Sequence, residues 1–225
     1  MEPRHGCWLA GLTFIVGGLV LGVVGVYWIL PATSREAQKT ARVAAAREGP
    51  FGLEAGMPLA DVREISGATA VGKGSGEFRL TDVPKPHSDF AEYRVFATER
   101  VGLCSILALG RPFTTDSDGE RTRSRFEALA AELSSLYGDG LKVDRVTEGS
   151  IWTTPGSFTI GLMKGERTLM MVWSEPELTL PHELATIGLV TEALGVNEVR
   201  FTLGYQFDNY KACEEEIKAS ERDAL

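Results

Sequence analysis

The stretch EVRFTLGYQF, residues 198–207, alternates apolar side chains with polar or small ones along its whole length. Successive side chains of a β-strand point to opposite faces, so this alternation predicts a strand with one buried face. Such a strand is typical of an antiparallel sheet, because parallel strands are usually buried on both faces. The apolar positions are Val199, Phe201, Leu203, Tyr205 and Phe207.

Neighbouring segments supply partners for this strand. Residues 186–192 precede it across a turn at 195–197, which predicts a hairpin. The other predicted strands are short runs rich in apolar, β-branched or aromatic residues, bounded by glycine, proline or polar turns. They are residues 77–81, 93–97, 103–109, 142–146, 158–163 and 168–173, with 93–97 pairing 103–109 and 158–163 pairing 168–173.

Helical periodicity is clearest between Phe126 and Tyr137, where apolar residues recur three or four positions apart and Gly138 follows. A shorter helix is predicted between Pro58 and Gly67. These elements predict an α+β domain in two layers, with helices packed on a mainly antiparallel sheet. The alternative is a tandem repeat of a helix followed by a strand meander, over residues 51–110 and 120–207.

The N-terminal run WLAGLTFIVGGLVLGVVGVYWIL, residues 8–30, is 23 residues long and carries no charge. A helix of this length spans roughly 35 Å, which is sufficient to cross a bilayer core of roughly 30 Å. Aromatic residues at both ends suit the two membrane interfaces. The run therefore predicts a transmembrane helix. The alternative is a cleaved signal peptide, although a signal h-region is usually shorter.

The chain is predicted to contain a short tail at 1–7, the transmembrane helix at 8–30, a helical stalk at 31–50, an α+β domain at 51–213 and an acidic tail at 214–225. Small residues share one stripe of the transmembrane helix, where two such helices can approach closely. This stripe predicts self-association, although glycine is also common in membrane helices. Its residues are Gly11, Gly18, Gly22 and Gly25.

The side of the membrane is indicated by opposing signals. Basic residues between Arg35 and Arg47 favour a cytoplasmic domain, whereas a short tail before one long apolar segment is typical of an exported one. Cys104 and Cys213 are the only cysteines of the domain and could form a disulfide in an oxidising compartment. Two buried free thiols are the alternative. We favour an exported, periplasmic or extracytoplasmic domain.

Charge restricts the class of partner. The whole chain is 44% hydrophobic and 24% charged, and residues 51–225 carry 18 Lys and Arg against 28 Asp and Glu, a net charge of −10. Nucleic-acid binding needs a basic surface, so this balance argues against it. Proteins or small ligands are the expected partners.

Catalytic and metal-binding motifs fail at specific positions. Residues 67–74, GATAVGKG, have the glycine and lysine spacing of a phosphate-binding loop, but Gly74 stands where Ser or Thr is required. Asp116, Asp118 and Glu127 suggest a calcium loop, yet three arginines interrupt it. His5, His87 and His182 are scattered along the chain. We therefore expect no enzyme activity, cofactor or metal.

These observations predict a single-pass membrane protein with a non-catalytic α+β domain for protein interaction or assembly in the cell envelope. The alternative is a membrane-tethered domain that senses or carries a small ligand.

Overall fold

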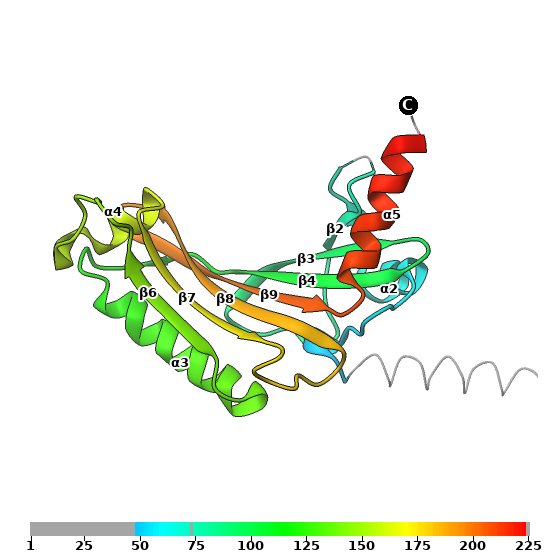
Figure 1. The fold of residues 1–225 in the computed structure, drawn as a ribbon, viewed down its shortest axis with the longest axis horizontal. Helices are drawn as coiled ribbons and strands as arrows, with labels where there is room; N and C mark the ends of the chain where they lie inside the picture. Colours follow the sequence, from blue (N-terminus) through cyan, green and yellow to red (C-terminus); the bar gives the residue numbers. More distant parts are fainter. Residues whose placement is uncertain (1–47, 73, 224–225) are drawn as a thin grey trace, which may run out of the picture. The chain divides into compact units, whose positions relative to one another are not determined.

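The computed structural model describes residues 48–72 and 74–223 (Figure 1). The predicted transmembrane segment 8–30, with Gly11, Gly18, Gly22 and Gly25, lies outside these residues, as does most of the predicted stalk. Within the described residues, no helix has both the length and the apolar character needed to cross a membrane.

The described domain is built on one sheet in which every strand pair is antiparallel. Its strand order is β1-β2-β3-β4-β9-β8-β7-β6, and β5 pairs with β9. The predicted α+β class with a mainly antiparallel sheet is confirmed. The strands are β1 Thr69–Ala70, β2 Glu77–Leu80, β3 Phe90–Thr98, β4 Gly102–Gly110, β5 Phe113–Thr114, β6 Leu141–Val146, β7 Arg167–Ser174, β8 Leu184–Gly195 and β9 Glu198–Phe207.

The described helices differ in length and in how much they bury. They are α2 Leu59–Ser66, α3 Glu120–Tyr137, α4 Phe158–Met163 and α5 Tyr210–Asp223, with short 3₁₀ turns at Pro50–Gly52 and Pro155–Ser157. Helix α3 buries Phe126, Leu129 and Leu133. The Phe126 ring lies 6.0 Å from the ring of Phe201 on β9, so α3 covers the face of β9 that the sequence predicts to be buried.

The order of the elements has an internal symmetry. Helix α2 is followed by β1 to β4, and α3 is followed by β6 to β9. Each half forms a meander, and the two meanders join through their last strands, β4 and β9, in antiparallel register. This topology fits the alternative of a helix-plus-meander unit that occurs twice.

One predicted strand is wrong. Residues Phe158–Met163 form helix α4 rather than the first strand of a hairpin. A 3₁₀ turn with Pro155 in its first position leads into this helix, and the Ser157 hydroxyl donates to the Thr154 carbonyl at 2.7 Å. Phe158 is then buried between α3 and β7, where the guanidinium groups of Arg123 and Arg167 lie 4.1 and 4.6 Å from its ring centre.

Helix α5 lies on the opposite side of the sheet from α3 (Figure 1). It contains most of the acidic segment 214–225 and packs against β3 and β4. The only residue of α5 that is buried is Cys213. The second face of the sheet is therefore covered by a helix at β3 and β4.

Candidate functional site

The strands β4, β9, β8, β7 and β6 present one face on the side opposite α3, which we call the open face. Residues on this face are aligned in rows across the strands. The central row consists of Leu107, Gly204, Gly188, Val172 and Leu141, each the direct partner of the next. Leu141 is 70% exposed, and Leu107 is exposed as well.

Two further rows flank the central row. An aliphatic row contains Val190, Met170 and Val143, with Thr202 at its β9 end. Val190 is exposed, and Met170 and Val143 are half-buried. A polar row on the other side contains Ser105, Gln206, Thr186 and Ser174. The open face thus places a strip of neutral hydrogen-bonding side chains beside apolar ones.

Gly188 and Gly204 interrupt the central row at adjacent positions. Neither has a positive φ angle, and the β8–β9 register is regular around them. A Cβ atom added to Gly188 would have no described atom within 4 Å, and one added to Gly204 would lie 3.7 Å from Leu107 Cδ1. Neither backbone conformation nor packing inside the domain therefore requires glycine at these positions.

Gly188 and Gly204 are part of the lining of a groove, which we call the glycine groove. It is an open groove with a volume of about 420 Å³. Tyr210, the first residue of α5, lines one end together with Phe96, whose ring centre lies 5.4 Å from that of Tyr210. The remaining lining includes the polar residues Ser105, Thr186 and Gln206 and the apolar Leu107.

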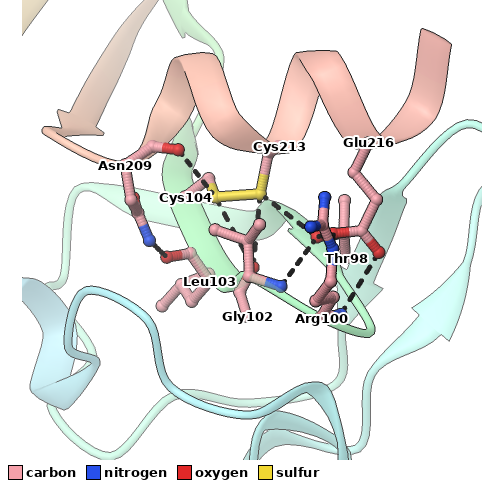
Figure 2. Close-up of a disulfide and its surroundings, with 9 residues drawn as sticks. Thr98, Arg100, Gly102, Leu103, Cys104, Asn209, Cys213 and Glu216 are labelled. Atoms are coloured by element: carbon pink, nitrogen blue, oxygen red, sulfur yellow. Dashed lines mark hydrogen bonds and ion pairs between the residues drawn. A yellow bond between two sulfur atoms is a disulfide. The ribbon is translucent and has the colours of Figure 1, made fainter. Parts of the chain in front are cut away.

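The disulfide that holds α5 is shown in Figure 2. Cys104 on β4 is bonded to Cys213 on α5, their Cα atoms are 6.5 Å apart, and both side chains are fully buried. Cys104 has no partner on β3, because Phe96 pairs with Ser105 while Ala97 pairs with Leu103. This β-bulge leaves Cys104 out of the ladder, and its sulfur reaches the helix.

Hydrogen bonds near the disulfide reinforce the position of α5 (Figure 2). The Thr98 hydroxyl donates to Glu216 Oε2 at 2.8 Å, and the Arg100 backbone N–H donates to Glu216 Oε1 at 3.2 Å. Asn209 donates its side-chain N–H to the Leu103 carbonyl at 3.0 Å. The wall of the glycine groove that α5 supplies is therefore fixed by one covalent bond and a few polar contacts.

Two charged side chains line the groove, Glu77 and Arg94. Arg94, which lines the groove, donates Nε to Glu92 Oε1 at 2.7 Å, and Arg79 donates to the same oxygen at 3.2 Å. The hydrogen bond from Arg94 and the positive charge of both arginines lower the pKa of Glu92 below its ordinary value, against the opposing effect of burial. Arg94 is thus bound to Glu92, whereas Glu77 contributes a carboxylate to the lining.

Other residues considered at the sequence level lie away from the groove. His87 Nε2 lies 3.8 Å from Glu132 Oε2 at the surface, and His182 is exposed with a φ of 59°. Asp116 accepts a hydrogen bond from the Arg121 backbone N–H at 3.1 Å. In the described parts of the chain, no group of three or more His, Cys, Asp or Glu side chains is arranged to hold a metal ion.

The glycine groove is a feature that the sequence interpretation missed. Gly204 fits the alternation of 198–207 as a small outward residue, and Gly188 lies in the predicted strand 186–192. Their pairing depends on the register between the two strands, which a turn of uncertain length does not define.

Comparison of the chain with protein-family models, curated proteins and solved structures found no match.

Proposed function

We propose that this chain is a single-pass membrane protein whose exported α+β domain binds another protein of the cell envelope through the open face. The observation that carries the proposal is the set of aliphatic side chains on the open face. Leu107, Val190 and Leu141 are exposed, and Met170, Val172 and Val143 are half-buried. Contiguous apolar surface of this kind, next to polar groups, is typical of protein-binding sites. In this proposal the domain is not catalytic.

Export is supported by the bond between Cys104 and Cys213. Disulfides persist in oxidising compartments and are rare in the cytosol of most organisms. The uncharged run at residues 8–30 supplies the anchor in this proposal.

The partner in this proposal is a different protein rather than a second copy of the domain. Residues 51–225 carry a net charge of −10, so two copies repel each other as they approach. A neutral or basic protein avoids this repulsion, and a basic one is attracted over distance. Self-association through the stripe of Gly11, Gly18, Gly22 and Gly25 would act separately, within the membrane.

Two experiments test the proposal. A reporter enzyme that is active only outside the cytoplasm, fused after Leu225, is expected to be active; activity of a cytoplasmic reporter alone would refute export. A photo-crosslinking amino acid at Val190 is expected to trap a distinct protein in intact cells, and Gly188→Leu should abolish the adduct. The control position is Ile151, which is 77% exposed but lies in a loop outside the open face. Equal trapping at both positions, or none at Val190, contradicts the proposal.

The groove volume also favours a second candidate, a small-ligand carrier. About 420 Å³ lies within the usual range of roughly 300–1,000 Å³ for ligand sites. A carrier retains its ligand through gentle purification. Native mass spectrometry of the full chain from membranes would then show an added small mass that Gly188→Leu removes, with no protein adduct at Val190.

A further inference from the structure

We infer that the protein partner inserts a tyrosine or tryptophan side chain into the glycine groove, over Gly188 and Gly204 and beside Leu107. This inference rests on the proposed function and specifies the chemistry of the contact. It begins from the cross-strand pair Gly188 and Gly204. A glycine inside a strand weakens the strand relative to alanine, so a pair of glycines in mid-sheet lowers stability.

The usual reasons for strand glycines do not apply to this pair. Their φ angles are not positive, no bulge lies between them, and alanine fits the space at both positions. The remaining reason is close approach of another molecule to the backbone. The glycines therefore mark the point of closest contact on the open face.

The size of the gap selects a large side chain. Leu107 and Val172 are separated by the strands β9 and β8, hence by three inter-strand spacings, or roughly 14 Å. Both positions between them lack side chains. A planar aromatic ring can lie flat over the backbone of the two half-buried glycines and contact Leu107, which lines the groove, at one edge.

The polar groups that line the groove then limit which side chain the partner can insert. Ser105, Gln206 and Thr186 lie beside the gap, and their side chains form no hydrogen bond with any described residue. An aliphatic side chain would cover these groups without satisfying them, which costs free energy. An anionic side chain would lose hydration without gaining a counter-ion, because Arg94 is already bound to Glu92 and Glu77 adds a negative charge to the lining. Tyrosine and tryptophan combine an apolar ring with one hydrogen-bonding group.

The test is selection of displayed peptides on the full-length protein in lipid nanodiscs, with wild type and a Gly188→Leu, Gly204→Leu variant as parallel targets. We expect peptides with tyrosine or tryptophan at one recurring position to be enriched on the wild type only. Gly188→Ala should weaken the best peptide by at least about tenfold, since an added methyl group overfills the contact. Gly156→Ala, at a turn where an added Cβ meets nothing within 4 Å, should leave its affinity unchanged.

The outcomes separate this inference from the function on which it depends. Enrichment of aliphatic or charged residues, equal selection by both targets, or no enrichment at all overturns the aromatic anchor. If a protein is still trapped at Val190 in cells, protein binding by the open face stands without it. If trapping at Val190 also fails, the proposed function fails too. Retained folding of the leucine variant is checked by its circular dichroism and melting temperature.

Discussion

Cys213 is bonded to Cys104, and it is the only side chain of α5 that is buried. The helix therefore depends on this bond more than on packing. Replacing both cysteines by alanine removes a link between residues 109 positions apart and should lower the free energy of unfolding by about 2–5 kcal/mol. Denaturant titration with and without a reductant checks this, because the reductant should affect the wild type and leave the double variant unchanged.

The same variant should expose α5 to proteolysis. Lys211, Lys218 and Arg222 are exposed on the helix, and a helix with so little burial unfolds locally once it is released. Trypsin should remove the C-terminal segment from the double variant before it attacks the sheet. Equal protection of α5 in both proteins would show that the polar contacts of Glu216 and Asn209 suffice to hold it.

Glu54 is expected to make stability depend on pH. Burial raises the pKa of this carboxyl above its ordinary value of 4.5, and the charges of Glu48 and Glu183 raise it further while His182 opposes them. The fold therefore favours protonated Glu54. The contribution of protonated Glu54 to the free energy of unfolding is fully present below pH 4.5 and is lost as the pH rises through the folded-state pKa.

Glu54→Gln should consequently stabilise the protein at neutral pH, and the gain should shrink as the pH falls towards 4.5. Denaturation curves collected from pH 4 to pH 8 give this difference directly. Glu148→Gln, at an exposed turn, is the control for loss of one negative charge. A gain for Glu54→Gln that is constant over this range would contradict the assigned cause.

Much of the sheet could be predicted from residue patterns. The alternation of residues 198–207 matches β9, and Gly138 follows the last residue of α3 as expected. The start of α3 was less evident, because its first turns carry Arg121, Arg123 and Arg125 and have no apolar face. Periodicity marks the segment of a helix that is buried and says little about its solvated end.

The identity of α4 could not be read from its sequence. Six largely apolar residues fit either a short buried strand or one and a half helical turns, and periodicity does not separate them. The deciding contact is tertiary, since Phe158 lies between Arg123 and Arg167. The glycine groove also depends on tertiary structure, because it requires a particular residue of β8 to pair with Gly204.

The packing of Phe158 makes a steric prediction at Gly119, which precedes α3. Gly119 has a φ of 76°, and an added Cβ would lie 2.1 Å from Phe158 Cδ1. Gly119→Ala must therefore adopt a strained left-handed backbone and also displace a fully buried ring. We expect a loss of at least about 2 kcal/mol in the free energy of unfolding, measured by denaturant titration.

Two matched variants identify the source of that loss. Gly165→Ala also has a positive φ, of 70°, but its Cβ meets nothing within 4 Å, so it should show the backbone cost alone, about 1–2 kcal/mol. Gly119→Ala combined with Phe158→Leu tests the clash, since a smaller side chain makes room for the methyl group. The double variant should be less destabilised than the sum of the two single changes, because the substitutions share one contact. Strict additivity would mean that the ring of Phe158 does not limit residue 119.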